Sequence, residues 1–229
     1  MKKKTRWPLY LIIGLIITFI AFTVPLPYYI EVPGTSEDIR KVLQVNNQPD
    51  QEEGSYQFVT VGVKHARLVD LVYAWLTPFT DIHSAKEMTG GSSDAEFMRI
   101  NQFYMETSQN MAKYQGLKTA GKEIELKYLG VYVLTVTDNS TFKGVLNIAD
   151  TVTAVNDKTF ESSKEMVDYV NSQTLGDQVK VTYEEDGKVK TAEGKIITLE
   201  NGKNGIGIGL IDRTEVSSDV PIKFSTAGI

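Results

Sequence analysis

The fold predicted for this sequence is organised around the segment Tyr128-Leu129-Gly130-Val131-Tyr132-Val133-Leu134. Its single glycine lies among apolar, β-branched and aromatic residues, which is typical of a strand that starts at a backbone turn. The glycine lets neighbouring amides converge and hold a carboxylate, and the exposed edge of the strand can accept an extended peptide as an added strand. The peptide-binding residues predicted here are Leu129, Gly130, Val131, Tyr132 and Val133.

The sequence after this strand predicts a small β-sandwich. A turn and a buried strand within 144–158 end at the two-residue turn Asn156-Asp157. Two further strands, 179–184 and 189–199, are joined through Asp186-Gly187, which is a strong hairpin signal.

A short amphipathic helix is predicted between these strands. Ser162 or Ser163 can cap its N-terminus, and Met166, Val167 and Val170 fall on one side of it. We predict that Met166 and Val170 shape a side-chain pocket beside the peptide-binding strand.

The order of these segments resembles that of bacterial PDZ domains. The matching pieces are Gly-Val-Leu, then Ala-Asp-Thr-Val-Thr-Ala-Val-Asn-Asp-Lys, then a helix, then Gly-Asp-Gln-Val-Lys-Val-Thr-Tyr-Glu-Glu-Asp-Gly-Lys. The resemblance covers about a third of the chain and implies a peptide-binding module. One departure is Ala149, where the family usually has glycine, so the turn there is expected to differ in its dihedral angles. A β-rich domain without a ligand is the alternative.

Composition narrows the classes of function. The chain has 229 residues, 41% of them hydrophobic, and a formal net charge of −5. Without the four basic residues before Trp7, 20 basic and 29 acidic residues remain, which argues against nucleic-acid binding. The lack of cysteine excludes disulfides, thiolate catalysis and cysteine-type zinc sites. We therefore expect no cofactor.

The N-terminal residues predict a membrane anchor. A basic head precedes an apolar run from Trp7 to Ile30, long enough for a span of about 20 residues. The basic residues place the N-terminus in the cytoplasm and the main domain outside the cell, so a single-pass protein of the cell membrane is expected. A cleaved signal peptide is the alternative, but the sequence around Ala21 offers no Ala-x-Ala site.

Residues 31–122 predict a mixed strand and helical region. A strand is expected over 56–63, a short helix over 68–76 that Pro78 stops, and a long helix from Ser93 to before Gly121. Apolar pairs recur along the long helix every seven residues, as internal core or as a contact between subunits of a homo-oligomer. These pairs are Phe97-Met98, Tyr104-Met105 and Met111-Ala112.

Neither histidine predicts a catalytic or metal site. Asp81-Ile82-His83-Ser84 contains three residue types of a catalytic triad, but triad members usually come from separate elements, so we expect a loop. His65 and His83 lack the spacing of a zinc motif.

The whole order of segments resembles the membrane-anchored Lon-like serine proteases of Gram-positive bacteria. The tail contains a buried strand within 202–211 and another at 220–225, and it ends at Ile229 on an apolar stretch, as a truncated chain would. The resemblance implies a Gly-Pro-Ser-Ala-Gly segment and a later lysine that are absent here, so no catalytic residue is predicted. Ser225 lies in the preceding strand and is not expected to act as a nucleophile.

We therefore predict an α+β chain that forms the peptide-binding part of an extracytoplasmic, ATP-independent serine endopeptidase acting on exported peptides, and that is itself inactive. A membrane-tethered PDZ scaffold or pseudoprotease is the alternative. The partners expected are a peptide or protein substrate and, through residues 7–30, the membrane. The predicted ranges are 1–30 for the head and transmembrane anchor, 31–122 for the mixed region, 123–200 for the PDZ domain and 201–229 for the start of a Lon-type proteolytic domain.

Overall fold

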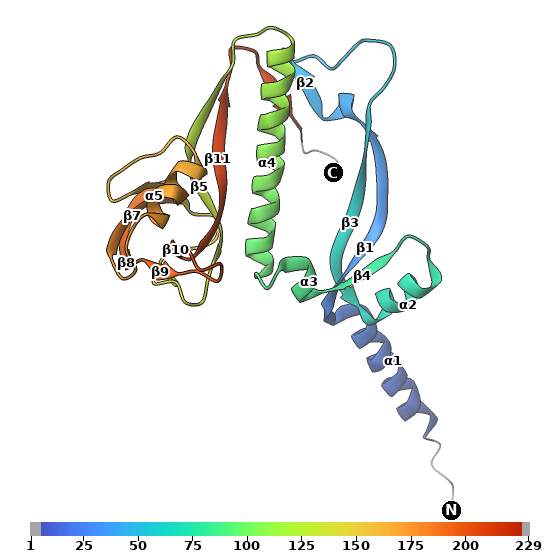
Figure 1. The fold of residues 1–229 in the computed structure, drawn as a ribbon. Helices are drawn as coiled ribbons and strands as arrows, with labels where there is room; N and C mark the ends of the chain where they lie inside the picture. The colour runs from blue at the N-terminus through green and yellow to red at the C-terminus, as the bar shows by residue number, and fades with distance from the viewer. Residues whose placement is uncertain (1–5, 226–229) are drawn as a thin grey trace, which may run out of the picture. The chain divides into compact units, whose positions relative to one another are not determined.

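The computed structural model describes residues 6–225, which form two compact units (Figure 1). The N-terminal unit contains the described residues up to Ser93 and those from Ile222 onward. The second unit runs from Asp94 to Pro221, so it includes the long helix as well as the predicted PDZ segment.

The first helix is shorter than the apolar run that contains it. Helix α1 (Trp7–Thr23) has 17 residues, about 25 Å at 1.5 Å per residue, whereas the hydrocarbon core of a bilayer is about 30 Å thick. In the described part of the chain, no helix combines the length and the apolar character needed to cross a membrane. The transmembrane helix predicted within 7–30 is therefore not supported. Pro25 disfavours helical geometry just before it, and the rest of the apolar run forms a strand.

The N-terminal unit is built on an antiparallel sheet in the order β3-β1-β4. Tyr29 lies opposite His65 on one neighbouring strand and opposite His83 on the other. The stretch 81–84, which we expected to be a loop, is the edge strand β4. The strands of this sheet are β1 (Pro25–Asp38), β3 (Gln57–Arg67) and β4 (Asp81–Ser84).

Short elements complete this unit. The predicted helix before Pro78 is present and ends at Leu76. Its first turn is held by Asp70, whose carboxylate accepts a hydrogen bond from the Arg67 amide at 2.8 Å and pairs with Lys64 at 2.9 Å. The remaining elements are α2 (Leu68–Leu76), α3 (Ala85–Thr89), the 3₁₀-helix η1 (Ile39–Lys41) and the paired strands β2 (Leu43–Val45) and β12 (Ile222–Phe224).

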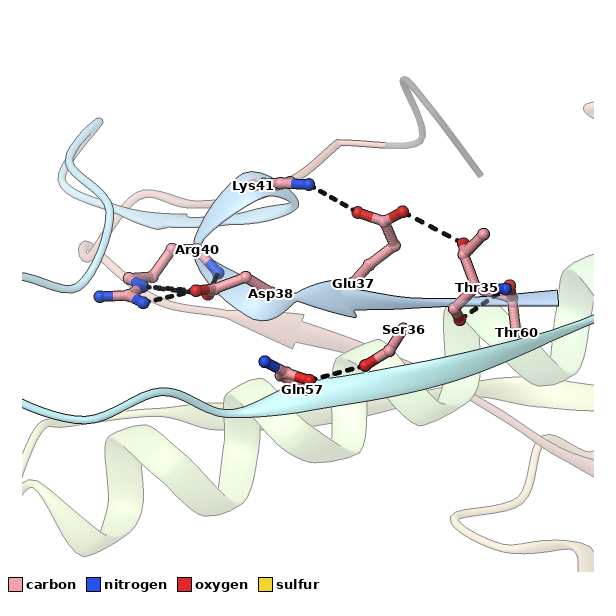
Figure 2. Close-up of polar contacts among 8 residues, drawn as sticks. All are labelled: Thr35, Ser36, Glu37, Asp38, Arg40, Lys41, Gln57 and Thr60. Carbon is pink, nitrogen blue, oxygen red and sulfur yellow. Dashed lines mark hydrogen bonds and ion pairs between the residues drawn. The ribbon is translucent and has the colours of Figure 1, made fainter.

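A polar network closes the end of β1 (Figure 2). The Asp38 carboxylate accepts hydrogen bonds from the Arg40 backbone amide at 2.9 Å and from Arg40 Nε at 3.0 Å. These contacts lower the pKa of Asp38 to about 2. The neighbouring Glu37 pairs with Lys41 at 2.8 Å. The charges thus fix the turn from β1 into η1.

The second unit contains a five-stranded antiparallel sheet in the order β11-β5-β6-β7-β8. Its strands are β5 (Glu125–Val136), β6 (Thr151–Val155), β7 (Gln178–Glu185), β8 (Lys188–Lys195) and β11 (Ile208–Ser217). The other elements are α4 (Asp94–Thr119), α5 (Ser163–Asn171) and the short pair β9 (Ile197–Thr198) and β10 (Asn204–Gly205).

Local sequence signals explain the turns of this unit. Asp186 and Gly187 have φ values of 48° and 75°, the left-handed geometry of a tight hairpin, and they join β7 to β8 as predicted. Asn156 and Asp157 also have positive φ, 52° and 62°, at the predicted turn after β6. The core of the unit comprises Val131, Val133, Phe142, Leu146, Val152, Val155, Phe160, Met166, Val170, Val179, Val181, Tyr183, Ile196 and Ile206.

Helix α4 packs through a different stripe from the one predicted. Its buried residues are Phe103 and Leu117, and the Phe103 ring stacks on Tyr132 of β5 with 3.8 Å between centroids. Met98, Met105 and Met111 of the predicted band are exposed. The homo-oligomer stays a prediction.

Candidate functional site

The glycine of the predicted binding strand lies within β5 rather than in an open turn. Gly130 has φ of 138°, and a Cβ there would lie 2.4 Å from the carbonyl oxygen of Val152. In the pairing with β11, Gly130 lies opposite Arg213 and Tyr128 opposite Thr214, so Leu129 has no partner and forms a β-bulge. Glycine is therefore required because β5 and β6 approach closely at this point.

Both edges of β5 are already paired. Towards β6, Val131 lies opposite Val152 and Tyr132 opposite Thr151, and the Val133 amide donates to the carbonyl of Asp150 at 2.9 Å. On the other edge, β11 pairs with β5 along its whole length, from Ile208 to Ser217. The open edge that we predicted for peptide addition is thus occupied by the chain's own strand.

We call the space between β5 and helix α5, which β11 occupies, the groove. Helix α5 forms one side of it. Ser162 caps it, because its hydroxyl accepts a hydrogen bond from the Glu165 amide at 3.2 Å. Met166 and Val170 are 2% and 4% exposed and point into the core. A cavity of about 50 Å³ remains between this face of α5 and the segment 205–210.

Strand β11 presents alternate side chains to this face. Ile208 and Leu210 pack against the core cluster that contains Met166 and Val170. The carboxylate of Asp212 accepts a hydrogen bond from the Ser163 amide at 2.8 Å, at the N-terminus of α5. A helix N-terminus carries partial positive charge, which stabilises a carboxylate there. The groove therefore holds two apolar side chains and one acidic side chain of the same strand.

The partly buried Tyr128 lies near Asp212 and Glu165 at the same end of the groove. Burial, with the nearby charges of Asp212 and Glu165, raises the pKa of the Tyr128 phenol to about 12. The Tyr128 side chain also packs against the core cluster. This tyrosine stays neutral at physiological pH. The start of α5 is contacted by Asp212 and also carries Glu165 in its first turn.

The opposite face of β5 and β11 packs against α4 and also carries polar groups. The Arg213 guanidinium donates to the Thr151 hydroxyl at 2.6 Å, and the Tyr132 hydroxyl donates to the carbonyl of Arg99 at 3.4 Å. Burial raises the pKa of Tyr132. A cavity of about 350 Å³ lies on this face, lined by Arg99, Gln102, Phe103, Glu106, Tyr132, Ala149, Glu184, Asp186, Gly187 and Arg213.

The turn before β6 keeps the geometry of a glycine although it carries alanine. Ala149 has φ of 84°, in the left-handed region that disfavours a Cβ. The next residue, Asp150, is buried and accepts a hydrogen bond from the Asn147 amide at 2.8 Å, and burial raises its pKa. The strained alanine and the buried acid are therefore adjacent in one turn.

The seven residues predicted from sequence fall into two groups. Leu129 to Val133 lie in β5 opposite β11 and β6, whereas Met166 and Val170 face the segment 205–210 and β11. The sequence reasoning missed that 208–217 completes this site. The Gly-Ile-Gly-Ile-Gly-Leu pattern at 205–210 signalled a strand, but no local signal identified β5 as its partner.

Comparison with known proteins assigns the class of this unit. Residues 102–196 match the family model of the PDZ domain. A search of curated proteins found no match. The chain is a PDZ-domain protein.

Solved PDZ domains from Listeria are similar in sequence to part of this chain. The PDZ domain of the SdrC-like protein from Listeria monocytogenes is 36% identical over 38% of this chain and 93% of that domain, with a TM-score of 0.36. The corresponding domain from Listeria innocua is 36% identical over 35% and 92%, with a TM-score of 0.34. A structure from Geobacillus thermodenitrificans is 30% identical over 35% and 94%, with a TM-score of 0.32.

Proposed function

We propose that this chain binds extended peptide segments beside α5 and is the peptide-binding part of an ATP-independent, Lon-like serine endopeptidase that processes exported peptides. The observation that carries the proposal is the position of β11, which is hydrogen-bonded to β5 and places side chains against α5. The domain thus accommodates one extended segment at the place where a peptide would add to the sheet.

The physical basis of recognition is strand addition. Backbone hydrogen bonds to β5 supply affinity for any extended segment, and alternate side chains that enter the groove supply specificity. One apolar side chain buried against Met166 and Val170 contributes about 1.5–3 kcal/mol. We expect dissociation constants in the micromolar range or weaker, since a few such contacts must also offset the ordering of the peptide.

The proposed link to proteolysis rests on the order of segments in the sequence. In such an enzyme this domain would hold the substrate for a nucleophilic serine and a lysine base supplied elsewhere. Ser225 follows β12, and its backbone amide donates to the carbonyl of Val42 at 2.7 Å. The chain itself is expected to bind peptides without cleaving them. A location outside the cell stays a prediction.

A peptide-binding assay tests the proposal. The intact chain is titrated against fluorescein-labelled decapeptides of varied sequence, and anisotropy is measured. Val167→Glu places a charge at the rim of the cavity beside α5, so we expect at least a tenfold loss of affinity. Val189→Glu is the matched control, because Val189 is 72% exposed on β8 and away from this cavity.

Two results would contradict the proposal. One is the absence of binding to every peptide, and the other is an equal effect of the two glutamate variants. Mass spectrometry of the same mixtures checks the role in proteolysis, since cleavage by the purified chain would show that it carries its own catalytic residues.

A further inference from the structure

Strand β11 has the contacts expected of a bound peptide. It is antiparallel to β5, and its register runs from Ile208 opposite Val136 to Ser217 opposite Glu125. It also contacts α5, whose Ser163 amide donates to Asp212. Because one segment makes both sets of contacts, its side chains report what the groove accepts at each position.

Two apolar side chains of β11, at alternate positions along the strand, pack into the groove. Ile208 and Leu210 pack on the core cluster of Met166 and Val170, and the remaining cavity of about 50 Å³ is too small for a further large side chain. An occupant therefore needs apolar side chains at two positions that are two residues apart. These positions lie on one face of a strand, as the period of two requires.

The residue between them must be small. A Cβ built on Gly209 would lie 2.3 Å from Thr135 Oγ1 and 3.5 Å from Thr135 Cβ. The two residues lie directly opposite each other in the ladder. Any larger side chain at this position forces Thr135 to move, so glycine is the preferred residue.

An acidic group follows. Asp212 Oδ1 lies 2.8 Å from the Ser163 amide nitrogen, and the first turn of α5 attracts negative charge. The acidic side chain lies two residues after the second apolar one, again on the face towards α5.

We propose, on the basis of the peptide-binding function above, that β11 is a built-in occupant of the groove and that the ligands which displace it share its pattern. The ligand class is an extended segment with two apolar residues that flank a glycine, followed two residues after the second apolar one by aspartate or glutamate. An external peptide binds only the fraction of molecules in which β11 has left, so occupancy by β11 weakens apparent affinity by that fraction.

A disulfide that holds β11 on β5, and that can be reduced, tests whether β11 must leave before a peptide binds. The chain has no cysteine, so Thr135→Cys with Gly209→Cys introduces one pair, and a Cβ separation of 3.5 Å suits a disulfide. The probe is a fluorescein-labelled Ile-Gly-Ile-Gly-Leu-Ile-Asp-Arg-Thr-Glu, the sequence of residues 206–215. We expect the oxidised protein to bind it at least tenfold more weakly than the same protein after reduction.

A variant that weakens the pairing of β11 with β5 should raise the affinity for the probe. Gly209→Val clashes with Thr135 and weakens the β5–β11 pairing, so affinity for the probe should rise at least tenfold over the unmodified chain. Gly209→Val with Thr135→Ala removes the clashing hydroxyl and should return affinity towards that of the unmodified chain. Circular dichroism checks that each variant remains folded.

Peptide variants test the ligand class. Replacing the aspartate of the probe by asparagine should weaken binding about two- to fivefold, and a scrambled probe should not bind. If varied peptides bind but oxidation and Gly209→Val change nothing, or if the scrambled probe binds equally well, the inference is wrong while the peptide-binding function stands. If no peptide binds the reduced or released protein, the peptide-binding function fails as well.

Discussion

Strand β7 of the PDZ unit and strand β3 of the N-terminal unit carry the same alternation of valines but bury it to different extents. Val179 and Val181 of β7 are at most 1% exposed, whereas Val59 and Val61 of β3 are 79% and 58% exposed. In β7 the apolar face lies under the core cluster that includes α5. Among the described residues nothing buries the corresponding face of β3. Alternation therefore predicts a strand but does not predict whether another layer covers it.

Replacing one valine of each strand by threonine should change the free energy of unfolding by very different amounts in the two units. Val181→Thr places a hydroxyl in a fully buried site, so the free energy of unfolding of the PDZ unit should fall by about 1–3 kcal/mol. Val59→Thr keeps a β-branched side chain in water, and the change should stay within about 0.5 kcal/mol. Urea denaturation, monitored by hydrogen exchange in each unit, measures the change in the free energy of unfolding for both variants. Equal losses would show that the face of β3 is buried in solution.

A glycine in the Ala149 turn should raise the stability of the PDZ unit, by less than Val181→Thr lowers it. Because Ala149 has φ of 84°, Ala149→Gly should remove local strain of about 1–2 kcal/mol and add chain entropy to the unfolded state. We expect a net gain of about 0.5–1 kcal/mol in thermal or urea denaturation. Gly130→Ala is the contrasting variant, since its Cβ would meet the carbonyl of Val152 at 2.4 Å and should destabilise the unit. A loss of stability in Ala149→Gly would contradict the strained geometry.

The stability of the two units should also depend differently on pH. We expect these changes in stability to be smaller than those of the substitutions above. The Asp38 carboxylate has a pKa lowered to about 2 by Arg40, so its contribution is present above pH 3.8 and is lost as the pH falls towards 2. Burial raises the pKa of Asp150, so its favourable contribution is present at low pH and is lost as the pH rises through that raised pKa.

Denaturation of Asp38→Asn and Asp150→Asn between pH 2 and pH 7 checks these signs. The stability advantage of the unmodified chain over Asp38→Asn should vanish near pH 2. Asp150→Asn should gain relative to the unmodified chain as the pH rises, because the amide oxygen can still accept the Asn147 hydrogen bond. Parallel curves for the unmodified chain and either variant would overturn the corresponding assignment.

Much of the PDZ unit was predictable because its signals are local. The Ser162 cap, the Asp186-Gly187 turn and the apolar face of Met166 and Val170 follow from residues a few positions apart. The pairing of β11 with β5 was not predictable in this way. It joins Ile208 to Val136 across 72 positions, and the sequence of neither strand specifies its partner.

In the N-terminal region, a local signal was present but did not separate two elements. The apolar run from Trp7 to Ile30 contains a helix and then a strand, and hydrophobicity alone does not separate them. Pro25 is the residue that could have marked the boundary, since the residue before a proline disfavours helical geometry. The short strand at 81–84 was missed because its pattern resembles a loop and its pairing with β1 is non-local.

Hydrogen exchange of the unmodified chain, with and without the labelled decapeptide that repeats residues 206–215, shows whether an external peptide displaces β11 from β5. If the peptide displaces β11, the amides of 208–217 exchange faster in its presence while those of β6 and β7 stay protected. Unchanged or stronger protection of 208–217 at saturating peptide would show that β11 is a permanent strand of the sheet and is not displaced.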